Sequence, residues 1–239
     1  MHITTKATQS EAFFKTIEKE ATSIGMAVNA KKNQMLCVSP ALHASNSTYI
    51  NIGNELSDRI HNCDTLKILG FLFSPKPDIS AQYSAMQLKF RRRVWVLRHL
   101  KKANISSSDL LKLYQSLILP VLDYTAVVYH SMLNRSQEAG LESLQKLALK
   151  IIYGKTGVSY TSLLELAAIE TLKDRRIRLT DKFIQKTSAN TKYNDWFPTK
   201  VLSDHNLRQE RIYKENRAKT SRLYNSPLYY YRRRLNDIA

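Results

Sequence analysis

Residues 79–103, ISAQYSAMQLKFRRRVWVLRHLKKA, decide the fold of most of this chain. Their apolar side chains recur at spacings of three and four residues, the pattern of an amphipathic helix. The members of this stripe are Tyr83, Met86, Phe90, Val94 and Leu97. The other faces of the same stretch are basic. It therefore predicts a helix that packs by one side on further helices and presents cations on its other sides.

Three further helices are expected downstream, beginning at Ser106, near Ser136 and at Thr171. Ser106 and Thr171 each precede an aspartate by three residues, which is the form of a capping box at a helix N-terminus. Pro120 should kink or restart the first of these helices, since proline cannot continue the backbone hydrogen bonding. Residues 79–190 are thus predicted to form a helical bundle.

The residues before this bundle have a different pattern. Residues 10–23 have helical spacing and precede Gly25, a residue typical of helix ends. Four apolar runs short enough to be strands follow, at residues 26–28, 34–38, 49–52 and 66–73. Gly53-Asn54 has the form of a hairpin turn. We expect a small antiparallel sheet that packs on the opening helix.

The predicted fold class is therefore α+β, mainly α. The small sheet and its helix should occupy residues 1–75, before the breaker Pro75-Lys76-Pro77, and the helical bundle residues 79–190. Residues 191–239 lose the helical periodicity and become a mixture of Tyr, Arg and Lys. They are predicted to be a loosely ordered basic tail.

The charge of the chain points to a polyanionic partner. Its formal net charge is +17 and its pI is about 9.9. Residues 1–79 hold 8 basic and 7 acidic side chains, whereas residues 80–239 hold the other 29 and 13. The positive field therefore belongs to the bundle and the tail.

Metal binding, a disulfide scaffold and a membrane span all have little support in the sequence. Cys37 and Cys63 are the only cysteines, too few for a disulfide framework, which indicates a reducing compartment. His61 and Cys63 are two ligands at most and do not make a tetrahedral site. The most apolar stretch, residues 110–129, contains Lys, Gln, Pro and Asp and is too polar for a membrane.

Three segments, in this order, resemble the reverse transcriptases of non-LTR retrotransposons, the RNA-directed DNA polymerases of LINE-like and jockey-like elements. Residues 25–32, GMAVNAKK, match the family's Gly-x-x-x-Asn-x-x-Lys segment behind the active site. Residues 66–71, LKILGF, resemble its primer-grip strand, with Ile68 in place of the usual aromatic residue. Residues 113–124, LYQSLILPVLDY, resemble a helix of its thumb.

The resemblance covers most of residues 10–190. It implies that residues 1–75 are the end of the palm, 79–190 the thumb and 191–239 a C-terminal extension. The family enzyme holds two divalent ions, Mg²⁺, on a Tyr-x-Asp-Asp loop and an earlier aspartate. This sequence has no Asp-Asp pair, and Met1 aligns just after that loop. We therefore expect no cofactor in this chain and no polymerisation by it alone.

The expected function is that of a partial reverse transcriptase that retains template and primer binding. Its partners would be RNA or an RNA/DNA hybrid, with the fingers and palm portion as a further possible partner and no membrane. The resemblance implies an intracellular location, in cytoplasm and nucleus. The alternative, from another class, is a basic helical interaction protein, domesticated or a relic, that binds an acidic protein or the missing half of the enzyme.

Two sets of residues are candidates for nucleic-acid contact. Leu69-Gly70-Phe71 corresponds to the primer grip, where glycine permits a close backbone approach; the alternative is a buried strand with a bulge. The basic side chains are suited to bind phosphates, and Trp95 offers a stacking face; the alternative is a solvated helix face. This second set consists of Lys89, Arg91, Arg92, Arg93, Arg98, Lys102, Arg175 and Arg176.

Lys32 matches a lysine that lies beside the nucleotide site in the family. There an ammonium group can protonate or stabilise the leaving pyrophosphate. Without the palm aspartates it has no substrate to serve, so we favour an ordinary solvated turn lysine. No catalytic residue is therefore assigned.

Overall fold

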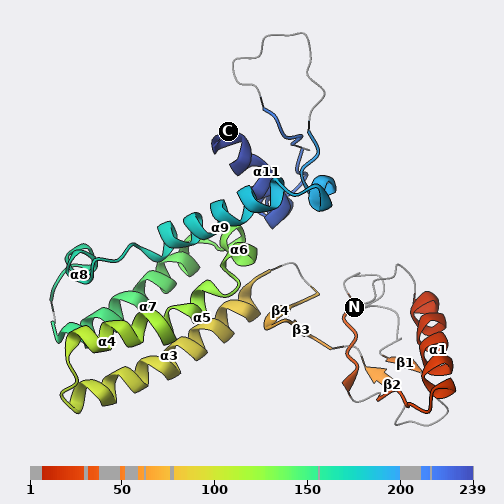
Figure 1. Ribbon diagram of the computed structural model, residues 1–239, viewed down its shortest axis with the longest axis horizontal. Helices are drawn as coiled ribbons and strands as arrows, with labels where there is room; N and C mark the ends of the chain where they lie inside the picture. Colours follow the sequence, from red (N-terminus) through yellow and green to blue (C-terminus); the bar gives the residue numbers. More distant parts are fainter. Residues whose placement is uncertain are drawn as a thin grey trace. The chain divides into compact units, whose positions relative to one another are not determined.

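The computed structural model is mainly helical with a small amount of antiparallel β-structure, as predicted (Figure 1). It divides into two compact units, residues 1–81 and 82–239. The residues that it describes are 7–29, 32–37, 49–51, 59–61, 63–75, 78–155, 157–199, 211–215 and 217–238.

The described residues of the smaller unit include a helix and two antiparallel strand pairs. Helix α1 (Ala7–Ser23) packs on β1 (Tyr49–Asn51), which pairs antiparallel with β2 (Arg59–His61). Ile60 of β2 is 1% exposed and is the centre of this core. Partly buried apolar side chains pack around it, namely Phe14, Val28 and Met35. The opening helix and the pairing of residues 49–51 are thus confirmed, while Gly53-Asn54 lies outside the described residues.

The expected strands at residues 26–28 and 34–38 are wrong for the residues that the structure describes, which reach Cys37. These residues form no named strand. The Met35 carbonyl oxygen instead accepts a hydrogen bond of 2.8 Å from the backbone amide of Cys63. A short apolar run forms a strand only where a neighbouring backbone continues the pairing. Among the described residues of this stretch, Met35 is an isolated bridge position and not part of a named strand.

The apolar run 66–73 is a hairpin and not one strand. β3 (Leu66–Ile68) pairs antiparallel with β4 (Phe71–Phe73). Leu69 and Gly70 form the turn between them, with positive φ angles of 48° and 84°. Two successive residues with positive φ suit the tight turn that the strand twist requires. Gly70 therefore serves the turn.

The larger unit is a helical bundle that begins with the helix predicted at residues 79–103. In Figure 1 its first helices lie side by side, and the C-terminal helix lies against the penultimate long one. The elements are α3 (Ser80–Lys102), α4 (Ser107–Leu113), η3 (Tyr114–Ile118), α5 (Pro120–Asp123), α6 (Ala126–Tyr129), η4 (His130–Met132), α7 (Arg135–Tyr153), α8 (Tyr160–Ala167), α9 (Leu172–Ser188), η5 (Thr191–Trp196), α10 (Ser221–Tyr224) and α11 (Pro227–Ile238).

The apolar stripe of α3 is buried as its spacing predicts. Met86, Phe90, Val94 and Leu97 are each at most 2% exposed. The Phe90 ring meets the ring of Tyr114 edge to face, with centroids 6.5 Å apart. Such aromatic contacts add to the free energy that burial of the rings supplies. This pair fixes α3 against the π-helical segment η3.

The predicted helix starts are confirmed by their hydrogen bonds. The Ser106 hydroxyl accepts from the backbone amide of Asp109, and the Thr171 hydroxyl accepts from that of Asp174, each at 3.1 Å. Pro120 is the first residue of α5, and the turn before it is π-helical. The missing amide of proline thus interrupts the α-helix where the sequence predicted.

The C-terminal segment differs from the expected loose tail. Residues 227–238 form α11, which packs on α9. Tyr231 and Leu235 of α11 are buried in one cluster with Ile184 and Phe197. The Tyr/Arg composition suggested a solvated tail, but residues 227, 231 and 235 lie at helical spacing and give α11 an apolar side. None of the described helices is long and apolar enough to cross a membrane.

Candidate nucleic-acid interface

Helix α3 presents cations without acidic neighbours. Residues 79–108 contain seven Lys and Arg side chains and no Asp or Glu. Among the described residues, no salt bridge joins any α3 cation to a carboxylate. The eight salt bridges that are found lie elsewhere. The positive charge of this helix is therefore uncompensated.

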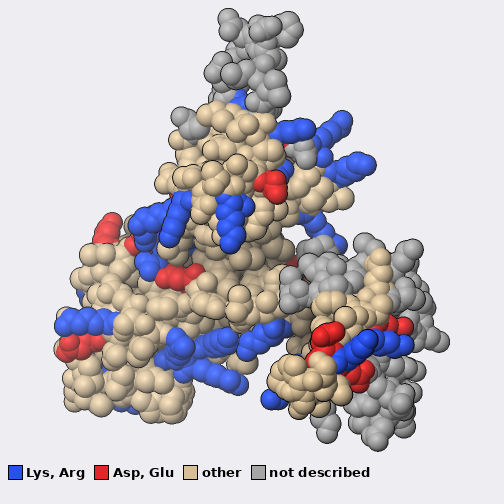
Figure 2. Space-filling model, turned by 45° about the vertical axis from the view of Figure 1, so that its right-hand side comes forward, with Lys and Arg blue, Asp and Glu red and all other residues tan. Residues whose placement is uncertain are grey.

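Most of the predicted phosphate-binding side chains lie on the accessible faces of α3. Lys89, Arg91, Arg92, Arg93, Arg98 and Lys102 are all exposed. In Figure 2, Lys and Arg side chains gather low on the larger unit, at the height of α3 in Figure 1. Arg93 differs from the others, since its Nη1 donates a hydrogen bond to the Leu117 carbonyl oxygen of η3. The others remain open to a ligand from solvent.

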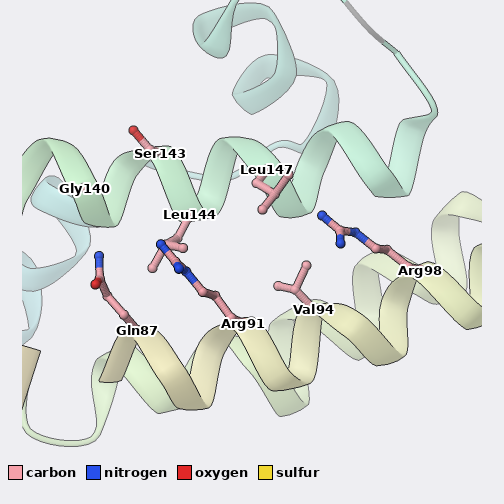
Figure 3. A pocket seen from close by; sticks show the side chains of 8 residues that line it. All are labelled: Gln87, Arg91, Val94, Arg98, Gly140, Ser143, Leu144 and Leu147. Atoms are coloured by element: carbon pink, nitrogen blue, oxygen red, sulfur yellow. The ribbon is translucent and has the colours of Figure 1, made fainter. Parts of the chain in front are cut away.

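A groove of about 470 Å³ runs between α3 and α7. Figure 3 shows the guanidinium groups of Arg91 and Arg98 extending from α3 across this opening toward α7. Val94, Leu144 and Leu147 line it with apolar surface. Gln87 and Ser143 add polar groups to the lining. A chain molecule with negative charges and apolar rings matches these walls chemically.

Gly140 brings α7 close to α3 at this groove. A Cβ atom on Gly140 would lie 2.1 Å from the hydroxyl oxygen of Tyr83. That hydroxyl accepts a hydrogen bond of 2.8 Å from Nε2 of Gln87, which also lines the groove. Glycine therefore leaves room for the Tyr83 hydroxyl, which a larger residue at position 140 would displace.

Arg175 of α9, a predicted nucleic-acid residue, is engaged inside the bundle. Its Nε and Nη2 donate to both carboxylate oxygens of Asp123 at distances between 2.7 and 2.9 Å. These hydrogen bonds raise the pKa of Arg175 above its ordinary value. A guanidinium held in this two-pronged way is not available to a phosphate.

Arg176, the next predicted residue, is a core side chain and is 2% exposed. Its Nη2 lies 3.8 Å from Oε1 of Glu138, and within the described residues its three side-chain nitrogens have no hydrogen-bond partner. The Thr171 side chain caps the N-terminus of α9, and Arg176 is among the buried residues of this helix. The assignment of Arg175 and Arg176 to a nucleic-acid surface is corrected accordingly.

The arginines of α11 are also used within the protein. Arg234 donates to both carboxylate oxygens of Asp181 at 2.8 Å, which raises the pKa of Arg234. Arg232 donates to the Trp196 carbonyl oxygen, and Arg233 donates to that of Tyr224 while lying 3.4 Å from the Tyr224 ring centroid. These arginines hold α11 in place.

His130 lies buried where α9 and α11 meet the middle of the bundle. Its Nε2 is 3.2 Å from the Tyr230 hydroxyl. Burial is the main cause that lowers the pKa of His130 to about 4; the positive charges of Arg176, Lys173 and Arg234 contribute to the lowering, and Asp181 opposes it. The imidazole is therefore neutral at neutral pH.

The remaining predicted residues lie in the smaller unit. Leu69 is 85% exposed at the hairpin tip, while Phe71 is 8% exposed and meets Phe73 edge to face. Leu69-Gly70-Phe71 is thus neither an extended strand along a ligand nor a bulge. Lys32 is an exposed residue whose amide donates to the Asn29 carbonyl oxygen, as expected of a turn lysine.

The sequence did not identify the α7 side of the groove as part of a site. Leu144 and Leu147 are apolar residues of the helix predicted to begin near Ser136, but nothing in their spacing shows which helix they face. Gly140 was the available signal, because an isolated glycine within a helical pattern often has a packing reason.

Tyr124, in the thumb-like motif, is 69% exposed and does not belong to the core.

The donors for the two divalent ions that the resemblance implies are not present in the structure as described. No group of three or more His, Cys, Asp and Glu side chains there lies close enough to hold a metal ion.

Comparison with known proteins gives no match: no protein-family model, no curated protein and no solved structure matches this chain.

Proposed function

We propose that this chain binds RNA or an RNA/DNA hybrid, without sequence selection, on the exposed cations of α3 and in the groove that α3 forms with α7. By its sequence resemblance we assign it to the thumb side of a non-LTR retrotransposon reverse transcriptase. In this role it holds template and primer and does not polymerise by itself. No adjacent pair of aspartates is present in its 239 residues to bridge two metal ions.

The observation that carries this proposal is the uncompensated charge of α3. Arg91 and Arg98 reach across a groove with apolar walls, and no described carboxylate pairs with them. Guanidinium groups bind phosphate oxygens in pairs of parallel hydrogen bonds. Since phosphate contacts carry no sequence information, the expected binding is independent of base sequence.

Salt dependence is the first test. The affinity for a short RNA/DNA hybrid should fall linearly with salt concentration on logarithmic axes, because each bound phosphate releases counterions, with a slope of about 0.9 per contact. An affinity that stays constant from low salt to near-molar salt would contradict the proposal.

A pair of variants with equal loss of charge tests the location. Arg91→Gln with Arg98→Gln should weaken binding roughly 10- to 100-fold and reduce the salt slope by about 2, since two phosphate contacts are lost. Arg232→Gln with Arg233→Gln removes the same charge from α11, where both side chains bind backbone carbonyls. It should change the affinity by less than about twofold. Equal losses in the two variants would place the binding elsewhere.

A protein partner is the competing function, and the exposed apolar side chains Leu88, Trp95 and Val96 on α3 favour it. In that case a co-expressed fingers and palm fragment would copurify with this chain and restore primer extension. Binding of nucleic acid by this chain alone would then be slight.

A further inference from the structure

One row of α3 side chains combines cations with an aromatic ring. Arg91, Trp95, Arg98 and Lys102 follow one another at steps of four, three and four residues. Residues at these separations are neighbours on one helix surface. Arg91 and Arg98 line the groove toward α7, and Trp95, which is exposed, lies between them in this row. An exposed indole ring is thus a neighbour of the two groove arginines on the surface of α3.

Trp95 is unusually exposed for its size. It has 58% of its surface accessible, although tryptophan is largely buried in most folded proteins. Its ring is tilted by 42° to the ring of His99, with centroids 3.8 Å apart. The same imidazole is held through Nδ1 at 3.0 Å from the Trp95 carbonyl oxygen. The indole is thus supported by a fixed neighbour and still accessible to a second ring.

We propose that Trp95 stacks on an unpaired base, so that the ligand preferred at this groove is a nucleic acid with single-stranded nucleotides. This inference rests on the proposed function and names its substrate class. A duplex keeps its bases stacked inside and offers this helix its phosphates, whereas a single strand offers both phosphates and open base faces. Arg91 and Arg98 bind the backbone on either side of the stacked base.

The test measures the affinities of a single-stranded oligonucleotide and a blunt duplex with equal numbers of phosphates, at several salt concentrations. Trp95→Ala should weaken single-strand binding roughly 5- to 100-fold, the effect expected for one stacked base. The salt slope should stay unchanged, since no charge is lost. Duplex affinity should change by less than about twofold, and Trp95→Phe should recover most of the loss because a ring is retained.

The matched control is Trp196→Phe, which alters the only other tryptophan of the chain. Trp196 lies in η5 beside Tyr193 and should not affect either affinity. In this variant Trp95 is the only source of tryptophan fluorescence. The single strand should quench this fluorescence on binding, and the duplex should leave it nearly unchanged.

The outcomes separate this inference from the proposed function. If neither probe binds the unaltered chain, the proposed function fails and this inference fails with it. If both probes bind and Trp95→Ala weakens neither or both alike, the proposed function stands and stacking is overturned. If poly-glutamate quenches Trp95 and the single strand does not, the face docks an acidic protein, which also overturns the inference.

Discussion

Helices α3 and α9 are both long, amphipathic and rich in arginine, but their charged side chains have different surroundings. The five exposed cations of α3 that bind no described partner face solvent or the groove toward α7. In α9, Arg175 binds Asp123, Arg176 is buried near Glu138, and Arg178 binds Glu170. The two helices show that a run of arginines indicates a binding surface only where the fold supplies no carboxylates to pair with it.

The difference also concerns what each set of charges stabilises. In α9 and α11 the arginines join helices that are distant in sequence, as Arg175 does with α5 and Arg234 does between α11 and α9. In α3, five of the seven cations have no hydrogen-bond or ion-pair partner among the described residues, and only Arg93 and Lys101 bind neighbouring segments. Substitutions in α9 and α11 should therefore change stability, and substitutions in α3 should change binding.

The largest expected effect on stability is that of Arg175→Gln. It leaves the half-buried carboxylate of Asp123 without its two-pronged partner and should lower the free energy of unfolding by roughly 2 to 3 kcal/mol. Urea denaturation measures this loss. The same change at exposed Arg91 should cost less than about 0.5 kcal/mol. Equal losses of unfolding free energy at the two positions would contradict the distinction between the arginines of α9, which pair with carboxylates, and the exposed cations of α3.

The second effect is a loss of stability in acid through His130. Its pKa is about 4 in the folded chain and 6.5 ordinarily, so the unfolded chain binds the proton first as the pH falls. Stability should be complete above pH 6.5 and decline from there toward pH 4, by about 2 kcal/mol at pH 5. Urea midpoints at neutral pH and at pH 5 measure the decline.

His130→Gln is the control for this acid effect, because glutamine does not titrate. The variant should lose that part of the pH dependence while the carboxylates titrate as before. A variant with the full pH dependence would show that His130 is not the source of the loss of stability in acid.

A smaller effect is expected where α11 docks on the bundle. The Tyr231 hydroxyl donates a hydrogen bond of 2.7 Å to the Val127 carbonyl oxygen, so Tyr231→Phe should cost about 1 kcal/mol. Tyr229→Phe removes a hydroxyl for which no hydrogen bond is found among the described residues, and should cost less. Thermal denaturation compares the two variants, and equal costs would argue against the docked position of α11.

The smallest effect concerns the groove beside α3. Gly140→Ala places a methyl group against the Tyr83 hydroxyl, which is the far end of a side chain that can move, so the cost should be about 1 kcal/mol or less. Adding Tyr83→Phe removes the clashing oxygen and should restore most of this stability. Thermal denaturation of the single and double variants tests the contact, and a double variant no more stable than Gly140→Ala would exclude it.

The elements of the bundle were predictable from local sequence. The stripe from Met86 to Leu97, the caps at Ser106 and Thr171 and the restart at Pro120 depend on residues within a few positions of one another. The runs at 26–28 and 34–38 were not predictable in this way, because a strand depends on a partner that periodicity does not identify. The docked position of α11 was not predictable from local sequence either, because α11 packs on α9, a helix about fifty residues away in the chain.

The sequence by itself determined that α3 is a helix, that its cations have no acidic neighbours along the chain, and that Trp95 lies among them. Only the tertiary structure decided that α7 completes a groove with Arg91 and Arg98 on its rim. It also decided that Arg175 and Arg234 pair with carboxylates and that Arg176 is buried near Glu138. The physical reason is that charge and periodicity are local properties of a chain, whereas pairing and burial depend on which distant carboxylates and apolar faces the fold brings into contact.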